Sequence, residues 1–405
     1  MTSRYSLRFY LVGAVAARAG DEMSGPALML AGFALAGSAT DASALLAGIT
    51  VSSAVGGPVL GVLLDRARRP GRLLAVSLVL YAAGLGTVLA GLGRLPFTLT
   101  VLIAVLTGLL GPALSGGWTA QLPRAVAADQ LPRANALDAM TFSLAGLAGP
   151  ALAGGTAEAL GAPAAVGVSV ALIAAALPSA WLLPARSDRT RNARTTSVID
   201  DLAAGLRVIV TGPPLARATL TSVLSCAAQG MLTACIALLG ERVLGGAGRG
   251  AVLLSCAAVS ALVANALLAR FPRSVAPDTV IWASALVQAA ALALAATGQP
   301  AVLIAAVLIM GIGEGPQLTA LFAVRHREAP QRLRGQIFTT GASLKITGFA
   351  LGAAVAGPLA AWSLPGALML AASVAVLAAA AFFAIPSAAV DETEDRACRV
   401  DQDRP

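Results

Sequence analysis

The amino-acid sequence predicts an all-α membrane protein with twelve transmembrane helices. Of its 405 residues, 57% are hydrophobic and only 12% are charged, which leaves too few polar side chains to cover a soluble protein of this length. The apolar residues fall into runs of about 20, the length that an α-helix needs to cross the hydrocarbon core of a bilayer. Short polar segments separate these runs, and no stretch remains that is long enough for a soluble domain.

The predicted spans follow one another along the whole chain. In order, they cover residues 9–35, 42–64, 73–92, 97–118, 136–157, 163–183, 216–239, 250–269, 278–297, 301–323, 337–360 and 366–385. The first apolar run is too long for the core of a cleavable signal peptide and lacks a small-residue cleavage site. We therefore expect it to remain as a membrane helix.

A longer polar segment divides the spans into two groups of six. We expect an N-terminal six-helix bundle, a cytoplasmic linker with an interfacial helix, a C-terminal six-helix bundle and a cytoplasmic tail, with boundaries at residues 1–184, 185–215, 216–386 and 387–405. The tail is charged and poor in apolar residues, a composition typical of disorder.

Within the linker, the sequence after Ser197 has the periodicity of an amphipathic helix. Ser197 is suited to cap its N-terminus, and Asp200 and Asp201 fall in the first turn, where negative charge is favoured. Apolar residues fall roughly on one face, namely Val198, Ile199, Leu202, Leu206 and Ile209. We expect this helix to lie along the cytoplasmic surface of the membrane.

The basic residues accumulate on one side of the predicted membrane. If the N-terminus is cytoplasmic, only Arg94, Arg242 and Arg249 fall in outside loops, and almost all other arginines fall in inside segments. This positive-inside pattern predicts a plasma (inner) membrane protein with both termini in the cytoplasm. The arginines are then suited to contact anionic lipid headgroups, so the net charge of +8 does not indicate nucleic-acid binding.

Residues suited to metal or cofactor chemistry are scarce. His326 is the single histidine, and the four cysteines show no metal-ligand spacing. The sequence also lacks the glycine-rich loop with Lys and Ser or Thr that binds ATP phosphates. We therefore expect no metal site, no cofactor and no enzymatic activity.

The loop between the second and third spans carries the most specific motif in the chain. It reads Gly61-Val-Leu-Leu-Asp65-Arg66-Ala-Arg-Arg69 and is followed by a Pro-Gly turn. This pattern resembles the loop between the second and third helices of major facilitator superfamily transporters. One departure is Arg68, which stands where the family usually has a glycine.

The linker carries a second resemblance to the same superfamily. Its sequence Asp201-Leu-x-x-Gly-Leu-Arg, followed by Pro213 and a new span, is similar to that of macrolide-efflux-type and siderophore-exporter-type facilitators. The resemblance implies a monomer with two pseudo-symmetric six-helix bundles around a central cavity, lined by spans one, four, seven and ten. A Gly-Pro pair at Gly111 in span four and again at Gly315 in span ten fits two related halves.

The Asp-Arg loop is suited to close the cytoplasmic side. Asp65 can accept hydrogen bonds from the unpaired N–H groups at the start of span eleven, near Gln336, where the helix dipole is positive. Arg66 and Arg69 can pair with acids or lipid phosphate, and we assign Gly61 to the same gating loop. Such contacts would hold the inner side closed and break when it opens.

Span one carries three ionisable residues close to the middle of the membrane. Arg18 lies three residues before Asp21 and four before Glu22, so all three share nearly the same helix face. They can form a self-neutralising group that lets the helix insert. Alternatively, two acids against one arginine leave a negative charge that can take a proton or meet a cationic substrate group. We expect Asp138, near the cytoplasmic start of span five, to be a helix-end or loop residue.

Span ten places Glu314 at a similar depth. Three glycines and Pro316 surround it, a composition typical of the broken helices in which transporters build their sites. No opposite charge within the span neutralises Glu314, so we expect a proton or substrate role, with a structural ion pair as the alternative. Lys345, the only lysine, is a candidate partner for Glu314 or for an acid of span one. The resemblance adds Gln229 and Gln317 as cavity residues.

Span five contains a sequence related to an antiporter signature. It resembles the Gly-Pro-x-x-Gly-Gly motif of facilitator antiporters, displaced by one residue at the terminal glycines, and comprises Gly149, Pro150, Gly154 and Gly155. Small residues also recur every four positions, which favours close helix packing, at Ala145, Gly149 and Ala153 and, in span eleven, at Gly348 and Gly352. We expect span five to slide against span eight or span eleven.

These features together predict a secondary transporter. We expect export of a small amphipathic compound, a drug or secondary metabolite, in exchange for protons that bind Asp21, Glu22 and Glu314. An uptake symporter or a uniporter of the same fold remains an alternative, because residues 101–118 lack the span-four arginine of many proton-coupled exporters. The repeated halves and the mid-membrane acids disfavour a non-transporting receptor or a lipid-modifying enzyme.

Overall fold

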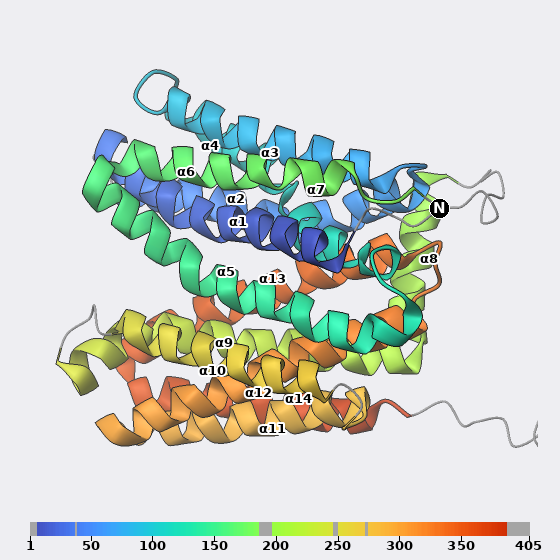
Figure 1. The fold of residues 1–405 in the computed structure, drawn as a ribbon. Coiled ribbons are helices and arrows are strands. Elements are labelled where there is room, and N and C mark those ends of the chain that lie inside the picture. Colours follow the sequence, from blue (N-terminus) through green and yellow to red (C-terminus); the bar gives the residue numbers. More distant parts are fainter. Residues whose placement is uncertain (1–5, 37–38, 186–196, 246–249, 272–273, 387–405) are drawn as a thin grey trace, which may run out of the picture.

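The computed structural model describes residues 6–36, 39–185, 197–245, 250–271 and 274–386. Within these ranges the regular secondary structure is entirely helical (Figure 1). The predicted tail at 387–405 lies outside the described residues, as do residues 186–196 of the predicted linker.

The first half of the chain forms six long helical spans, two of which are interrupted. Its helices are α1 (Leu7–Ala36), α2 (Ala39–Arg66), α3 (Pro70–Gly91), α4 (Phe97–Gly108), α5 (Leu131–Leu160), α6 (Ala162–Ala175) and α7 (Leu177–Trp181). A π-helical turn at Ala113–Gly117 continues the span of α4, and α6 and α7 together form one span. Two short 3₁₀ turns, Leu122–Arg124 and Ala128–Gln130, lead into α5.

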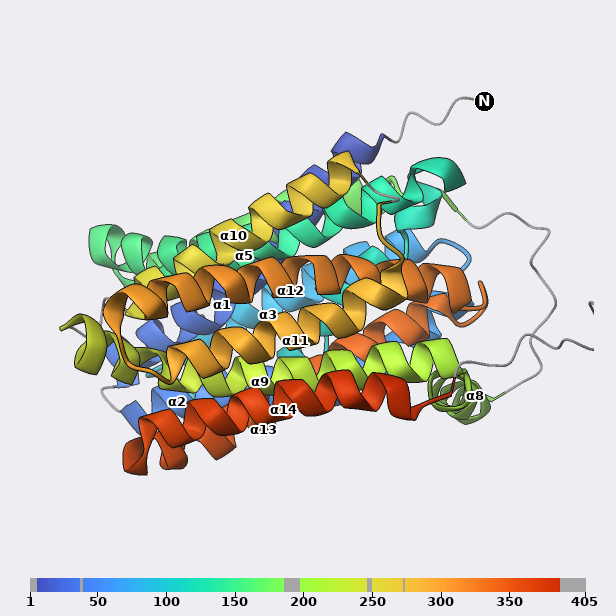
Figure 2. The same cartoon turned by 90° about the horizontal axis from the view of Figure 1, so that it is seen from below.

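The second half begins with the linker helix and continues with six unbroken helices. They are α8 (Val198–Thr211), α9 (Pro213–Leu244), α10 (Gly250–Arg270), α11 (Pro277–Ala295), α12 (Pro300–Glu328), α13 (Arg334–Trp362) and α14 (Leu364–Ala384). Figure 2 shows α11, α12 and α14 running along one another, with α8 lying across the end of the bundle.

The chain is a multi-pass membrane protein, as the sequence predicts. In the described residues, eleven helical spans are long and apolar enough to cross a membrane. The twelfth, α1, has 30 residues and is distinguished from the others by Arg18, Asp21 and Glu22 in its middle. Each of the twelve predicted spans therefore corresponds to an observed helix or pair of helices.

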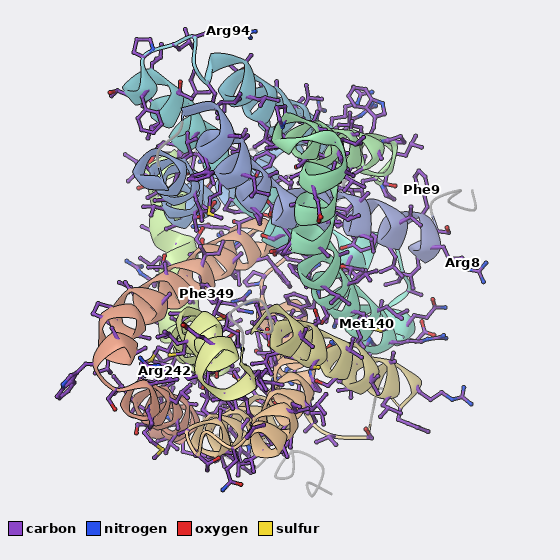
Figure 3. All side chains as sticks on the ribbon, turned by 90° about the vertical axis from the view of Figure 1, so that its left-hand side faces the viewer. Arg8, Phe9, Arg94, Met140, Arg242 and Phe349 are labelled. Atoms are coloured by element: carbon purple, nitrogen blue, oxygen red, sulfur yellow. The ribbon has the colours of Figure 1, made fainter. Side chains whose placement is uncertain are left out.

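Each half has its own apolar core. Buried residues from α1 to α7 form one cluster that includes Tyr10, Met23 and Trp118. Buried residues from α9 to α14 form a separate cluster that includes Met231 and Met310. Figure 3, seen along the helices, shows the two helical bundles side by side, with the labelled Arg94 and Arg242 on opposite bundles. The predicted arrangement of two six-helix bundles is confirmed.

The two halves contact each other mainly through α2 against α13 and α5 against α10. Glycines permit the first contact, because a Cβ atom at Gly57 would overlap the backbone of Thr339 and one at Gly61 would overlap that of Gln336. Span five thus meets span eight, as predicted. Figure 1 shows the halves close together at the end where α8 lies, which we call the α8 end, and diverging toward the opposite end.

The linker helix α8 begins as predicted. Ser197 Oγ accepts a hydrogen bond from Asp200 N at 3.1 Å, and the Asp200 carboxylate accepts one from Ser197 N at 3.1 Å. Hydrogen bonds from the Ser197 hydroxyl and backbone N–H hold the pKa of the Asp200 carboxyl below its ordinary value. The side chains of Ile199 and Leu206 are exposed, so α8 presents apolar groups away from the protein.

Two local predictions are wrong. Span ten is not broken at Glu314: α12 runs continuously, with Pro316 inside it. A Cβ at Gly311 would overlap the backbone of α10, and one at Gly313 would lie 3.0 Å from Ser284 O in α11, so these glycines allow close helix packing. Asp138 is also not at a helix end, because α5 begins seven residues earlier, at Leu131.

Candidate functional site

Arg18 of α1 is held in a buried ion pair with Asp138 of α5. Arg18 Nη1 lies 2.9 Å from Asp138 Oδ1, and the two side chains are 2% and 0% exposed. Thr119 completes the network, because its Oγ1 accepts from Arg18 Nη2 at 2.8 Å and donates to Asp138 Oδ2 at 2.8 Å. The Arg18 guanidinium also hydrogen-bonds to Thr141 and lies 3.7 Å from the ring centre of Phe142.

The self-neutralising group predicted for span one is therefore wrong. Arg18 is neutralised by Asp138 rather than by its neighbours in α1, since no ion pair joins it to Asp21 or Glu22 in the described residues. Asp21 instead accepts a 2.7 Å hydrogen bond from the Tyr81 hydroxyl of α3. Glu22 is exposed and lies against α5, where a Cβ at Gly149 would be 2.7 Å from its own Cβ.

On the other half, Glu314 forms a loose polar group with residues from α9 and α13. Lys345 is near enough to Glu314 to interact electrostatically, and both also interact with the thiol of Cys226. Within the described part of the chain, no basic group forms an ion pair with Glu314 within 4.0 Å, and the Glu314 side chain is exposed. The structure thus places Lys345 near Glu314. This glutamate is one of the two partners predicted for Lys345.

Glu314 lies on the side of α12 that faces the first half. Leu318 and Phe322 follow it at four-residue spacing, so the three side chains form one stripe. Leu318 and Phe322 pack against Ala120 and Phe142 of the first half. Counting about 1.5 Å per residue from the α8 end of each helix, Glu314 and Glu22 both lie about 21–22 Å deep.

The two predicted glutamines belong to a hydrogen-bonded chain that crosses the second half. Gln229 Nε2 donates to Gln288 Oε1 at 3.2 Å, and Gln288 Nε2 donates to Gln317 Oε1 at 3.0 Å. Gln317 Nε2 then donates to Ser225 Oγ at 3.0 Å. Gln317 is buried inside the bundle, whereas Gln229 is partly exposed and lies one turn from Cys226. The chain connects α9, α11 and α12 and holds them in register.

Aromatic side chains from both halves meet between the depth of Glu22 and Glu314 and the α8 end. We call Phe142, Phe322, Phe338 and His326 the aromatic cluster. The ring centres of Phe142 and Phe322 are 5.7 Å apart, those of Phe322 and Phe338 5.9 Å, and those of His326 and Phe338 4.5 Å. Because Phe142 comes from α5 and the others from α12 and α13, the cluster packs the halves together on this side.

The loop that carries Asp65 makes the contact predicted for it. Asp65 Oδ1 accepts from Gly335 N at 2.9 Å, and Asp65 Oδ2 accepts from Gln336 N at 2.8 Å, in the first turn of α13. Arg66 Nε lies 2.8 Å from Asp201 Oδ2, so α8 provides the acid for this arginine. Arg69 is exposed at the start of α3. The carboxylate of one half thus caps the positive end of a helix of the other.

The small-residue faces pack within each half rather than between the halves. Ala145, Gly149 and Ala153 are buried on α5, and Gly149 lies against α1 at Glu22 and Met23. On α13, a Cβ at Gly348 would lie 2.7 Å from Val223 O, and one at Gly352 would overlap Ala227. The remaining motif residues differ: a Cβ at Gly154 or Gly155 would meet no atom within 4 Å, and Pro150 is exposed.

For three residues of the site, Asp138, Arg325 and His326, the structure differs from what the sequence predicts. Asp138 is expected at a helix end or in a loop, although Pro132, which is typical of a first helical turn, indicates that α5 starts before it. Arg325 and His326 follow the predicted end of span ten at residue 323, but α12 extends to Glu328 and buries both, leaving 2% and 6% exposed. Pro330 was the available signal, because a helix usually ends before the residue preceding a proline.

Comparisons with known proteins agree with this architecture. A family model described as Major Facilitator Superfamily matches residues 10–344. An uncharacterised MFS-type transporter, y4rN of Sinorhizobium fredii (strain NBRC 101917 / NGR234), is 29% identical over 356 residues, which cover 85% of this chain and 84% of that protein.

Three solved structures share the fold. The human organic anion transporter MFSD10 (TETRAN) has a TM-score of 0.77 at 15% identity, over 94% of this chain and all of that one. A bacterial homologue of the iron transporter ferroportin, in an outward-facing state, has a TM-score of 0.77 at 16% identity, over 93% and 98%. The E. coli fucose:proton symporter FucP has a TM-score of 0.71 at 15% identity, over 94% and 99%. Because the family model spans most of a chain that folds in this way, the chain belongs to the major facilitator superfamily of transporters.

Proposed function

We propose that this transporter exports a small amphipathic compound in exchange for protons. The observation that carries the proposal is the pair Glu22 and Glu314, one in each half, at the same depth and exposed. Neither carboxylate has an ion-pair partner within 4.0 Å in the described residues. A carboxylate inside a membrane is costly when no ion pair in contact neutralises it, so it takes up a proton or meets a cationic group.

The orientation that we propose follows from the arginines. Cytoplasmic loops of membrane proteins are enriched in Lys and Arg, and the α8 end carries the exposed Arg68, Arg69 and Arg72. We therefore place the α8 end and both termini in the cytoplasm, with the protein in the plasma membrane. In this orientation the aromatic cluster closes the cytoplasmic side, and the site opens outward.

Alternating access would link the two carboxylates to this closure. Protons that bind Glu22 and Glu314 from outside neutralise the two carboxylates and favour the inward-opening movement. That movement separates Asp65 from Gly335 and Gln336 and parts the aromatic cluster. Substrate binding from the cytoplasm then displaces the protons. Carboxylates at one depth and the apolar rings of the aromatic cluster nearer the α8 end suit a compound that has both a polar and an apolar part.

Transport in the opposite direction is the main alternative. The same fold serves FucP, whose description is a fucose:proton symporter, so the fold alone does not set direction. The described part of span four, Phe97–Gly117, carries no charged residue, unlike many proton-coupled exporters. Flux measured with the proton gradient imposed in each direction separates the two functions.

The test is substrate flux into proteoliposomes that hold the purified protein. A panel of cationic, neutral and zwitterionic drugs is presented under a pH gradient of either sign. Wild type is compared with Glu314→Gln, which removes the charge and keeps the shape, and with Glu241→Gln as a matched control at the exposed end of α9. We expect accumulation against the proton flow in wild type and in the control, and its loss in Glu314→Gln.

Each other result has a defined meaning. Accumulation in the same direction as protons would establish symport and contradict export. Flux that needs no gradient and persists in Glu314→Gln would establish facilitated diffusion and leave Glu314 as a structural residue. Gradient-driven export that persists in both variants would move the coupling site away from Glu314, with Glu22→Gln as the next substitution to test.

A further inference from the structure

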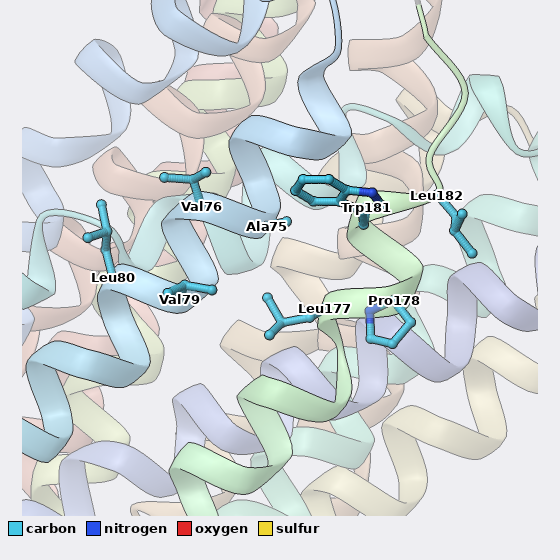
Figure 4. Close-up of a pocket in the computed structure, with 8 residues that line it drawn as sticks. All are labelled: Ala75, Val76, Val79, Leu80, Leu177, Pro178, Trp181 and Leu182. Carbon is cyan, nitrogen blue, oxygen red and sulfur yellow. The ribbon is translucent and has the colours of Figure 1, made fainter.

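An apolar groove runs along the outside of the first half, between α3 and α7. It has a volume of about 550 Å³ and is lined by Ala75, Val76, Val79, Leu80, Leu177, Pro178, Trp181 and Leu182. In Figure 4, Val79 and Leu177 point toward one another across the groove, and the Trp181 ring lies near Ala75. The groove is separate from the candidate transport site, because none of the residues that line it takes part in the contacts described between the two halves.

The groove lies beside the interruption of span six. The regular helix α6 ends at Ala175, and α7 begins at Leu177 with Pro178 in its first turn. Val79 of α3 lies across from Leu177, and the small Ala75 lies beside the Trp181 ring. A large aromatic ring, Trp181, then closes the groove at the α8 end and is 53% exposed.

The groove lies within one leaflet of a bilayer. Its lining on α3 runs from Ala75 to Leu80, five residues or about 8 Å along the helix. Leu80 lies ten residues, or about 15 Å, from the start of α3, and the hydrocarbon core of a bilayer is about 30 Å thick, so the groove ends near the middle of the membrane. Part of an acyl chain of a lipid in the leaflet at the α8 end would fill the groove.

A basic group stands at the headgroup end. The Arg72 guanidinium lies 5.1 Å from the ring centre of Trp181, a cation–π contact that holds it over the end of the groove. Arg72 is exposed, as are the neighbouring Arg68 and Arg69, and Arg72 has no ion pair among the described residues. A guanidinium stacked in this way keeps its N–H edge free for phosphate oxygens, which it binds in a bidentate manner.

We propose that this groove is a specific site for an anionic phospholipid. One acyl chain lies between α3 and α7 against Val79, Leu80 and Leu177, and the phosphate accepts hydrogen bonds from Arg72. The Trp181 ring sits at the depth of the headgroup boundary, where membrane proteins concentrate tryptophan. The proposal does not depend on the substrate or the direction of transport.

The test uses Trp181 itself as the reporter. A variant that keeps only this tryptophan (Trp118→Phe, Trp282→Phe, Trp362→Phe) is reconstituted in phosphatidylcholine bilayers that contain a small fraction of acyl-brominated phospholipid. We expect brominated phosphatidylglycerol to quench Trp181 at about fivefold lower mole fraction than brominated phosphatidylcholine, given the attraction of one arginine for anionic lipid. In Arg72→Gln this preference disappears. In Arg94→Gln, an exposed arginine at the opposite end of α3, it stays.

A second reporter and a second measurement guard against a folding defect. Trp362 is 86% exposed at the opposite end of α13, so a variant that keeps only Trp362 should show no preference between the two lipids. If the multiple variant does not fold, native mass spectrometry of the protein with all tryptophans intact compares lipid retention instead. We expect Arg72→Gln to lose one tightly retained phosphatidylglycerol and Arg94→Gln to lose none. Equal quenching by the two lipids, or retention unchanged by Arg72→Gln, would overturn the proposal.

Discussion

At the scale of single residues, Asp65 joins the two halves through backbone rather than side-chain groups. Its two oxygens accept from Gly335 N and Gln336 N, and the residue is 4% exposed. The partners are unpaired N–H groups of a helix N-terminus, which are present whatever side chains follow. A carboxylate here gains from the charge, from the helix dipole and from two hydrogen bonds at once.

Substituting Asp65→Asn should slow transport without abolishing substrate binding. The amide keeps an acceptor oxygen but loses the charge and one of the two hydrogen bonds, a loss of about 1–2 kcal/mol of closure. Turnover and substrate affinity in proteoliposomes measure the effect, with Glu158→Gln on α5 as a control. We expect slower turnover and an affinity within a few-fold of wild type. A large loss of affinity would count against a gating role.

The buried pair of Arg18 and Asp138 makes each partner dependent on the other. Removing one leaves an isolated charge among apolar groups, so Arg18→Met or Asp138→Leu alone should destabilise the protein by about 3–5 kcal/mol. The double variant, which leaves no isolated charge, should recover most of that loss. Denaturant unfolding in detergent micelles measures all three. Losses that simply add in the double variant would show that the two residues are not coupled.

At the scale of helices, the two glycine positions of the span-five motif have different surroundings. A Cβ at Gly149 would lie 2.7 Å from the Cβ of Glu22 and 2.9 Å from its carbonyl carbon, so α1 and α5 touch through backbone there. Gly154, one and a half turns further, faces open space. The same helix therefore offers a tight position and a matched control.

Gly149→Leu should destabilise the protein and reduce its transport, whereas Gly154→Leu should do neither. The larger side chain at Gly149 must push α1 away, and overpacking of this kind destabilises by about 1–3 kcal/mol. It should also shift Glu22 and reduce proton-coupled flux. Thermal unfolding in detergent and proteoliposome flux measure both effects. If the two substitutions behave alike, close packing of α1 on α5 does not explain the motif.

At the scale of the whole molecule, three layers of contact hold the α8 end closed. The outermost is α8 itself, which bonds to the first half through Arg66 and Asp201 and to the second through Gln336 Nε2 and Leu202 O at 2.9 Å. The contact of Asp65 in α2 with the first turn of α13 is the next, and the aromatic cluster is the innermost. Further from the α8 end than the Asp65 contact, the Ser53 carbonyl accepts a hydrogen bond from Ser343 Oγ at 2.6 Å.

Removing the central ring of the aromatic cluster should open this end. Phe322→Ala loses packing worth about 3–5 kcal/mol, more than the 1.4 kcal/mol that changes a population tenfold. A cysteine introduced by Ala139→Cys, at a fully buried position, reports the opening in a background whose native cysteines are replaced. We expect alkylation by a membrane-impermeant maleimide, added at the α8 side, to rise at least about tenfold. Phe349→Ala, exposed on α13, should leave the rate unchanged.

The features that the sequence predicts correctly rest on local chemistry. Hydropathy places all twelve spans because crossing a bilayer requires an apolar run of fixed length at each position of the chain. The cap at Ser197 is predicted because its partner, Asp200, lies three residues away. The contact of Asp65 with the start of α13 is predicted because a family motif and an unpaired helix N-terminus together specify both partners.

The features that the sequence does not predict depend on which helix lies beside which. Nothing near Arg18 in the chain indicates Asp138, which is 120 residues away. Of the nearer acids, Asp21 accepts a hydrogen bond from Tyr81, and Glu22 lies against α5. Gly149 packs on α1 rather than between the halves, and the glycines around Glu314 support close packing rather than a break. The sequence by itself determined the twelve spans, the N-terminal cap of α8 and which spans carry charged residues. Only the tertiary structure decided the partners, because helices inside a membrane choose their neighbours by the fit of side chains across them, and that fit exists only once all of them are assembled.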